Sequence, residues 1–349
     1  MKIRDNKKRG NSRKERERLP FITIITPVKH ESKYIVECVS SLLNLDYPKD
    51  RHEIIVVMDR DATKEVGDAL RFFRGRIKVI KDSKRGSAAH RNLGAKNASK
   101  KAKYFAFTDA DCIVSRQWLK ALVRRMEEVQ KEDSSIGCVG GLNFVPKTDS
   151  RFAKLVGALE QTLLGSGGSA QSAIRKKERI VESIPNCNAM YKKGLWGRNR
   201  QDESLIIGQD GEFNYRLRKK GVRFIVIPGA IVWHHRTSSL KGYIRRMYKY
   251  GVAAARIAKM HPGILRTRWY ALLSLAGMIA ALALLILSLI SIPAMYAFIS
   301  LAGIYILMLL ATTAKVLMSI KGPIALLTPL LLFFQHGLYN IGFLAGLFR

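Results

Sequence analysis

Long runs without charged residues near the carboxyl end most constrain how this chain can fold. No Lys, Arg, Asp or Glu occurs from Trp269 to Ser291, from Ile292 to Ala314, or from Pro323 to Phe348. Each run exceeds the roughly 20 residues with which a helix crosses a bilayer. One such run is compatible with the core of a soluble protein, but three in succession favour membrane-spanning helices. We therefore predict three transmembrane helices, at about 269–291, 293–315 and 323–347.

The charges beside these runs predict their orientation. Arg266 and Arg268 precede the first run, whereas the turn near Pro293 is uncharged. Lys315 and Lys321 lie between the second run and the third. Because Lys and Arg that flank a span are retained in the cytoplasm, we expect the large amino-terminal part to be cytoplasmic and the carboxyl terminus to lie outside. The protein is then a multi-pass protein of the cell (plasma) membrane.

A strong excess of positive charge predicts an anionic partner. The chain has 60 Lys and Arg against 27 Asp and Glu, a formal net charge of +33. Nucleic acid would be one such partner. In a membrane protein, anionic lipid headgroups and a nucleotide-diphosphate substrate explain the charge more simply, so we expect no nucleic acid. Residues 1–18 are basic and almost free of apolar side chains, which is typical of a disordered tail that follows the membrane surface or keeps the chain soluble.

Between Leu19 and Ile227, short β-favouring runs alternate with helical periods. Such alternation predicts an α/β fold of Rossmann-like type, with a mainly parallel sheet covered on both faces by helices. Ligands of such folds bind beyond the carboxyl ends of the strands. The predicted strands are 21–25, 53–57, 77–80, 104–108 and 137–144, and the helices are 33–43, 63–73, 87–97 and 117–131. The residues that follow the strands are Pro27, Glu31, Asp59, Asp61, Asp109 and Asp111.

An acidic pair, Asp109 and Asp111, directly follows the strand-like run YFAFT. Residues i and i+2 of a strand project to the same side, where two carboxylates repel unless a cation or hydrogen-bond donors lie between them. Mg²⁺ and Mn²⁺ prefer oxygen ligands and often share them with substrate phosphates. The pair therefore predicts a metal-diphosphate site, and a solvated acidic turn is the alternative.

The four cysteines are far apart and show no zinc-ligand spacing, so we expect reduced, structural thiols. Cys112 adjoins the acidic pair, but the sequence shows no base that would make it a nucleophile. The other three are Cys38, Cys138 and Cys187.

An ordered series of segments resembles the family 2 glycosyltransferases of GT-A fold, over roughly Pro20 to Pro262. A closer similarity, to the succinoglycan-type, ExoA-like membrane glucosyltransferases, is carried by GQDGEFNYRLRKKG, LLGSGGS (163–169) and RTSSLKGYIRRMYKYG (236–251). The resemblance implies a catalytic domain over 19–236, an amphipathic interfacial segment over 237–267 and transmembrane helices within 268–349. The segments of the family series are PVKHE (27–31), VVMDRDATKE (56–65), RGSAAHRNLGAKNA (85–98), TDADC (108–112) and GQDGEFNYRLRKKG (208–221).

The resemblance also implies how a nucleotide sugar is bound. Pro27, Glu31 and Asp59 match the residues that surround the base and ribose. Arg91 and Asn92 match the ARN-like element near the diphosphate. His90 stands where many relatives carry Ala, and the sequence offers no explanation of that difference.

The metal and the general base follow from the same resemblance. Asp109 and Asp111 match the DxD pair, with Asp111 as the direct ligand of Mn²⁺ or Mg²⁺. His234 matches a histidine that completes the metal site, and an ordinary histidine at a strand end is the alternative. Asp210 matches the general base. A helix N-terminus would hold this carboxylate ionised, although an acidic N-cap is also expected for stability alone. Gln209 replaces the usual Glu before it.

Two further segments are predicted to act at the membrane. Leu240 to Met260 places Tyr243, Met247, Tyr250 and Ala254 on one stripe, which is typical of an interfacial helix and also of plain helix packing. Gly165 to Ser169 is glycine-rich and is expected to be a flexible loop that closes over the acceptor, or a plain linker.

Together these features predict a membrane-anchored, metal-dependent inverting glycosyltransferase (hexosyltransferase). It would move a hexose from a UDP- or GDP-sugar to a lipid-linked saccharide or polyprenyl carrier at the cytoplasmic face, in polysaccharide biosynthesis or a related pathway. A polyprenyl-phosphate sugar synthase, which uses the lipid phosphate as acceptor, is one alternative. A non-catalytic basic membrane scaffold is another, from a different functional class.

Overall fold

The computed structural model describes residues 19–167 and 177–348, and the chain divides into two compact units. The first unit comprises Met1–Asn143 and Lys176–His234, and the second comprises Phe144–Arg175 and His235–Arg349. The sequence predicts one catalytic domain over 19–236, whereas the structure assigns residues 144–175 to the second unit. The predicted basic tail, 1–18, lies outside the described residues.

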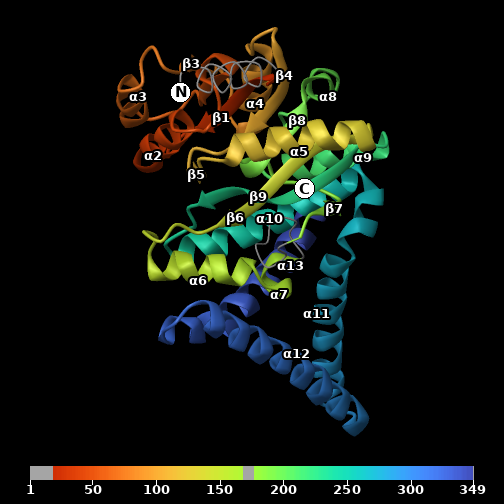
Figure 1. Ribbon diagram of the computed structural model, residues 1–349. Coiled ribbons are helices and arrows are strands. Elements are labelled where there is room, and N and C mark those ends of the chain that lie inside the picture. The colour runs from red at the N-terminus through yellow and green to blue at the C-terminus, as the bar shows by residue number, and fades with distance from the viewer. Residues whose placement is uncertain (1–18, 168–176, 349) are drawn as a thin grey trace, which may run out of the picture. The chain divides into compact units, whose positions relative to one another are not determined.

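A mixed sheet forms the centre of the first unit (Figure 1), with the strand order β3-β2-β1-β4-β8-β6-β9-β5 and with β7 beside β9. The pairs β1–β2, β1–β4 and β2–β3 are parallel. The pairs β4–β8, β5–β9, β6–β8 and β7–β9 are antiparallel. The prediction of a mainly parallel sheet is therefore correct for one half of the sheet only. The strands are β1 Phe21–Val28, β2 His52–Met58, β3 Lys78–Lys81, β4 Ala102–Phe107, β5 Cys112–Val114, β6 Ile136–Phe144, β7 Arg179–Val181, β8 Ala189–Lys192 and β9 Arg223–His234.

Helices cover both faces of this sheet, because successive strand residues alternate between the faces. On one face, Ile24 of β1 and Val56 of β2 share a core with buried residues of α2, α3 and α5, such as Leu122. On the other face α4 packs on β1 and β2, and Trp196 of α8 stacks on Phe107 of β4 at a ring-centroid distance of 4.2 Å. The helices of this unit are α2 Ser32–Leu43, α3 Lys64–Arg71, α4 Ser87–Lys96, α5 Trp118–Glu132, α8 Lys193–Arg198 and α9 Gln209–Lys219, with the 3₁₀ turns η1 Lys49–Arg51 and η2 Asn186–Asn188.

The second unit is helical, and α10 packs closely on α13. A Cβ atom added at Gly251 of α10 would lie 2.0 Å from the carbonyl oxygen of Tyr339, and one added at Gly342 of α13 would lie 2.2 Å from that of Tyr248. Only residues without a side chain permit this approach of two backbones. The elements are α6 Arg151–Glu160, α7 Leu163–Ser166, α10 Leu240–Met260, η3 Pro262–Arg268, α11 Trp269–Leu287, α12 Ile292–Ser319, η4 Pro323–Leu327 and α13 Thr328–Leu347.

Two helical segments are long and apolar enough to cross a membrane. They are Ile292–Ser319 and Pro323–Leu347, which correspond to the second and third predicted spans. In the most apolar part of α12 only 6% of the residues are buried, which is not how a core helix of a soluble protein behaves. The first predicted span, 269–291, corresponds to α11, which ends at Leu287 and whose apolar part, Ala271–Leu287, is shorter than the other two.

Of the two segments expected to act at the membrane surface, Leu240–Met260 is helix α10, and Gly165 and Ser166 of the other lie in α7. Tyr243, Met247 and Ala254 of α10 are buried as predicted, but Tyr250 is exposed, and the buried face packs on α13. Gly165 is not in a flexible loop, because it lies in α7 and its N–H donates to the hydroxyl of the N-cap residue Thr162 at 3.1 Å. Residues 168 and 169 of the predicted loop lie outside the described residues.

Substitution of Gly141 by Ala should destabilise the first unit. A Cβ at this position of β6 would lie 1.7 Å from the carbonyl oxygen of Ala230 on β9, so the strands must separate. We expect a loss of about 1–3 kcal/mol or more in the free energy of unfolding, measured by thermal unfolding of the detergent-solubilised protein. Gly197→Ala is the matched control, because it lies in α8 with no atom within 4 Å of the added Cβ. An unchanged Gly141→Ala protein would contradict the close β6–β9 approach.

Candidate active site

The acidic pair after β4 divides between two different partners. The strand ends at Phe107, so Asp109 and Asp111 lie in the turn before β5, and the strand alternation assumed from the sequence does not apply to them. One oxygen of Asp109 is 2.6 Å from a guanidinium nitrogen of Arg91. One oxygen of Asp111 is 3.3 Å from Nε2 of His234. The turn therefore presents one carboxylate to a fixed cation and the other to an imidazole.

Arg91 joins the acidic turn to the predicted general base. Its side chain is only 3% exposed, and its second terminal nitrogen lies 3.5 Å from Oδ1 of Asp210. A buried guanidinium is stable only when it is paired, and two carboxylates provide that pairing here. The sequence places Arg91 beside the diphosphate, whereas the structure places it between Asp109 and Asp210.

Asp210 is the second residue of α9 and not its N-cap. The N-cap is Gly208, whose φ of 82° is in the left-handed region that glycine adopts readily. The Asp210 carboxylate accepts hydrogen bonds from the backbone N–H of Asn186 at 3.1 Å and from its side-chain amide at 3.2 Å. Burial raises the pKa of Asp210 above its ordinary value, although Arg91 and the Asn186 N–H act in the opposite direction. A carboxylate with a raised pKa is suited to accept a proton.

The residue before Asp210, where the resemblance implies a Glu, is the neutral Gln209, and its contact is structural. The Gln209 side-chain amide donates to the hydroxyl of Ser87, the first residue of α4, at 2.6 Å. Gln209 is 8% exposed, so this bond links the beginnings of α9 and α4 inside the unit.

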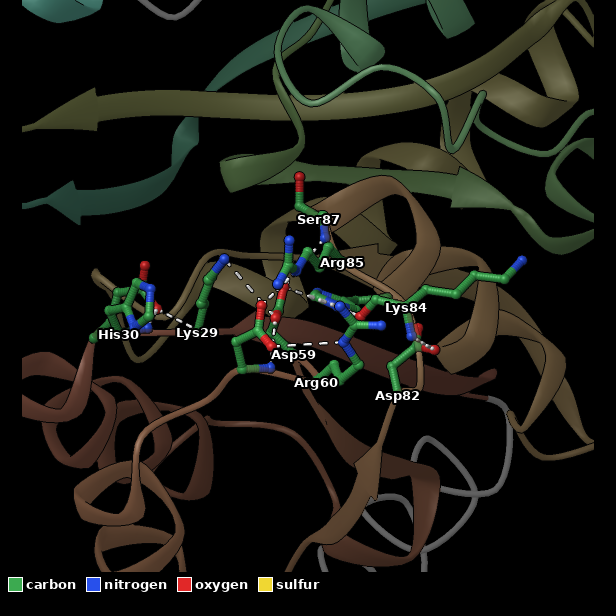
Figure 2. A network of polar contacts seen from close by, with 12 residues as sticks. Lys29, His30, Asp59, Arg60, Asp82, Lys84, Arg85 and Ser87 are labelled. Atoms are coloured by element: carbon green, nitrogen blue, oxygen red, sulfur yellow. Dashed lines mark hydrogen bonds and ion pairs between the residues drawn. The ribbon is translucent and has the colours of Figure 1, made fainter.

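Asp59 forms the centre of a second polar network, at the carboxyl ends of β2 and β3. Its buried carboxylate accepts from the backbone N–H of Asp61 at 2.9 Å and of Gly86 at 3.1 Å. Nε2 of His90 lies 3.5 Å away, and Nζ of Lys29 lies 3.9 Å away. Figure 2 shows Lys29 directed toward Asp59, with Arg60 and Arg85 nearby, and these two arginines pair with Asp61. His90, which the sequence leaves unexplained, thus occupies the space beside Asp59.

The other predicted donor-binding residues have mainly structural contacts. Pro27 lies within β1, one residue before its end. The Glu31 carboxylate accepts from the backbone N–H groups of Lys29 and His30, at 2.7 and 2.8 Å. The Asn92 amide donates to the carbonyl oxygen of Gln201 at 2.9 Å and to Glu203 at 3.0 Å, and its oxygen accepts from the Gln201 N–H at 3.1 Å. Asn92 therefore fixes the 201–203 segment, and its role near a diphosphate stays a prediction.

Asp111, Cys112 and His234 form a group that could hold a metal ion. One potential ligand atom from each lies within 4.8 Å of the other two. The sequence predicts Asp111 and His234 at this site but not Cys112. Asn186, which binds Asp210, was also missed, and nothing in the sequence around it distinguishes it from other loop residues.

Residues 23–193 match the family model described as glycosyl transferase family 2. The chain contains a family 2 glycosyltransferase domain. A curated relative from Methanococcus voltae is 28% identical over 337 residues, which are 94% of this chain and 98% of the relative. Its name is dolichyl N-acetyl-alpha-D-glucosaminyl phosphate 3-beta-D-2,3-diacetamido-2,3-dideoxy-beta-D-glucuronosyltransferase. Glycosyltransferase AglE of Haloferax volcanii is 34% identical over 105 residues, 29% of this chain and 34% of the relative.

A solved structure confirms the GT-A type of fold. The mannosyltransferase PcManGT from Pyrobaculum calidifontis, solved with GDP-Man and Mn²⁺, superposes with a TM-score of 0.61 at 18% identity and covers 94% of this chain and 88% of its own. The protein is a glycosyltransferase, and the prediction of an enzyme is confirmed over that of a basic scaffold. The relative matched along its whole length is archaeal, and the finer similarity to ExoA-like enzymes remains a prediction.

Replacement of Arg91 by Met should lower kcat and shift its pH dependence. Without the guanidinium the pKa of Asp210 rises further, so the ionised base is lost at a higher pH than in the wild type. We expect kcat to fall by at least ~10²-fold, because the two carboxylates also lose their fixed positions. The acidic limb of the kcat profile should move to higher pH. Arg91→Lys keeps the charge but cannot reach both carboxylates, so an intermediate kcat is expected. An unshifted limb in Arg91→Met would show that Asp210 is not the titrating base.

Proposed function

We propose that this glycosyltransferase is an inverting, metal-dependent enzyme that moves a hexose from a nucleotide sugar to a lipid-linked saccharide at a membrane. The observation that carries the proposal is the position of Asp210. This carboxylate has a raised pKa and lies within 3.5 Å of the same guanidinium that binds Asp109 of the acidic turn. A base and a diphosphate-binding element are thus connected through one buried side chain.

The proposed reaction is a single displacement. The acceptor hydroxyl oxygen attacks the anomeric carbon while its proton passes to Asp210, and the bond from that carbon to the nucleoside diphosphate breaks. The electron pair of this bond leaves with the diphosphate, and the configuration at the carbon is inverted. Asn186 holds both oxygens of Asp210 through two N–H donors, which fixes the direction in which the base faces.

The residues present suit a divalent cation. Asp111 and His234 would hold it, since carboxylate oxygen and imidazole nitrogen are common ligands of Mn²⁺ and are 3.3 Å apart in this pair. Asp109 of the same turn is paired with Arg91 beside the site. Mn²⁺ or Mg²⁺ would neutralise the charge that develops on the leaving diphosphate. The Mn²⁺ in the mannosyltransferase structure supports this choice. Asp59, together with Lys29 and Arg85, is proposed to face the base and ribose of a UDP- or GDP-sugar.

The proposed acceptor and location follow from the second unit and from the relative. The M. voltae enzyme is named for transfer to a dolichyl phosphate-linked sugar. In this chain, α12 and α13 are long and apolar enough to span a bilayer, and α10 carries basic residues that suit anionic lipid headgroups. The positions of Lys315 and Lys321 support a cytoplasmic catalytic domain. We propose a multi-pass protein of the plasma membrane that meets its lipid-linked acceptor at the cytoplasmic face.

Substitution of Asp210 or Asp111 by Asn should abolish sugar transfer without unfolding the protein. Asp210→Asn removes the proton acceptor, and a loss of about 10²–10⁴-fold in kcat is expected. Asp111→Asn weakens the metal site, so its activity should recover in part at high Mn²⁺. Asp46→Asn is the matched control, because that side chain is 42% exposed and pairs only with surface residues such as Lys120. Full activity of either variant, measured with a radiolabelled nucleotide sugar, removes that residue from its role.

A panel of acceptors should separate the proposed function from a polyprenyl-phosphate sugar synthase. We expect transfer to polyprenyl-linked saccharides and none to polyprenyl phosphate alone, because Asp210 is positioned to deprotonate a hydroxyl, which a fully ionised phosphate does not need. The measurement is thin-layer separation of the labelled lipid products with UDP- and GDP-sugars in parallel. Transfer to polyprenyl phosphate alone would establish the synthase instead.

A further inference from the structure

The candidate metal site is built on a cross-strand pair. Cys112, the first residue of β5, is directly opposite His234, the last residue of β9, in an antiparallel register. Directly opposed residues project to the same face of a sheet, with Cβ atoms about 4.5–5.5 Å apart. Asp111 completes the group, with one oxygen 3.3 Å from Nε2 of His234 and 3.9 Å from Sγ of Cys112. One sulfur, one nitrogen and one oxygen ligand thus converge from two adjacent strands.

The remaining acid of the turn is less available to a metal than this group. One oxygen of Asp109 is held by Arg91 at 2.6 Å, and the Asp109 backbone carbonyl accepts from the thiol of Cys38 at 3.4 Å. A cation beside Asp109 would also approach the buried Arg91 guanidinium, and like charges repel. The ligand set that the geometry favours is therefore Asp111, Cys112 and His234.

A second thiol adjoins this group. Cys187 of η2 lies in the same buried cluster as Cys112. Its sulfur also accepts a hydrogen bond from the side-chain amide of Asn143 at 3.1 Å. Cys112 and Cys187 are 1% and 5% exposed, so the sulfur side of the site is shielded from water, while Asp111 and His234 form its accessible side.

We propose that Cys112 is a sulfur ligand of the catalytic metal site, an inference that rests on the proposed function. The site therefore accepts thiophilic divalent ions such as Zn²⁺ and Co²⁺, and not only the hard ions Mg²⁺ and Mn²⁺. Thiolate sulfur and imidazole nitrogen select Zn²⁺ and its neighbours, whereas Mg²⁺ requires oxygen ligands and retains its waters. On binding, the Cys112 thiol proton is released to solvent, and a sulfur–metal bond forms. Asn143 holds the sulfur of Cys187, which shares the buried cluster with Cys112.

The test uses Co²⁺ alone as the probe, with the full-length protein in detergent and a phosphine reductant that does not bind metals. A thiolate bound to Co²⁺ gives an intense charge-transfer band in the near ultraviolet, which oxygen and nitrogen ligands do not give. We expect this band in the wild type and its loss in Cys112→Ser. The Co²⁺ affinity of this variant should fall by more than the ~10–100-fold that loss of an outer-shell partner costs. Its Mg²⁺ affinity should change by much less.

Cys138→Ser is the matched control and should keep the band. Cys138 is also fully buried, but it lies on β6, opposite Tyr191 of β8. Should Cys112→Ser not fold, Cys112→Ala and Cys187→Ser distinguish the two thiols: the band should be lost in the first and kept in the second. A Co²⁺ complex without the band, in a protein that still transfers sugar with Mn²⁺, overturns the sulfur ligand and leaves the proposed function intact. A wild-type protein that binds no divalent ion and turns over no nucleotide sugar overturns the proposed function itself.

Discussion

The buried ion pairs of Arg91 are the interaction on which the catalytic unit depends. Parallel strands direct their carboxyl ends to one edge of the sheet, and in this chain the segments that follow β2 and β4 carry the acids Asp59 and Asp109. Asp210 joins Asp109 at that edge from a helix far along the sequence. Carboxylates brought together in this way repel, and a single guanidinium with two forked donors compensates both at once. The position of α4, which carries Arg91, is therefore coupled to the position of α9.

That coupling also explains Gln209. A Glu at this position, which is 8% exposed, would add a carboxylate next to Asp210 and would raise the pKa of Asp210 further. The neutral amide adds no charge and donates to Ser87 at the beginning of α4. The two helix beginnings are thus joined twice, by Arg91 with Asp210 and by Ser87 with Gln209. Gln in place of Glu thus adds no negative charge to the site, and it keeps a hydrogen bond between the beginnings of α9 and α4.

The parallel half of the sheet could be predicted from the sequence because each of its strands is a compact β-favouring run followed by a helical period. The antiparallel half could not. Strand β9 contains Pro228 and Gly229, residues that usually indicate a turn, and β5 has only three residues. The contact of Cys112 with His234 depends on this unpredicted antiparallel pairing of β5 with β9, since 122 positions separate the two residues in the chain. The hydrogen bonds of Asn186 to Asp210 could not be predicted either, because they form only where the fold brings η2 close to α9. By contrast, the motifs and the strand order predict that Asp109, Asp111 and Asp210 lie at the site. They do not predict which residues these carboxylates contact.

In the second unit, the spacing of the apolar residues of α10 is compatible with two environments, lipid or another helix. The stripe of α10 was predicted from spacing, and it is buried as expected at Tyr243 and Met247. The sequence alone does not say whether lipid or protein covers such a stripe, because both exclude water equally well. The glycines decide it: Gly251 and Gly342 bring the backbones of α10 and α13 together, and a lipid chain would need no such gap. With α13 as a proposed membrane span, its contact with α10 would keep the Arg and Lys of α10 at the headgroup level without insertion of α10 itself. The proposed anchor and the charged surface would then form one structural element.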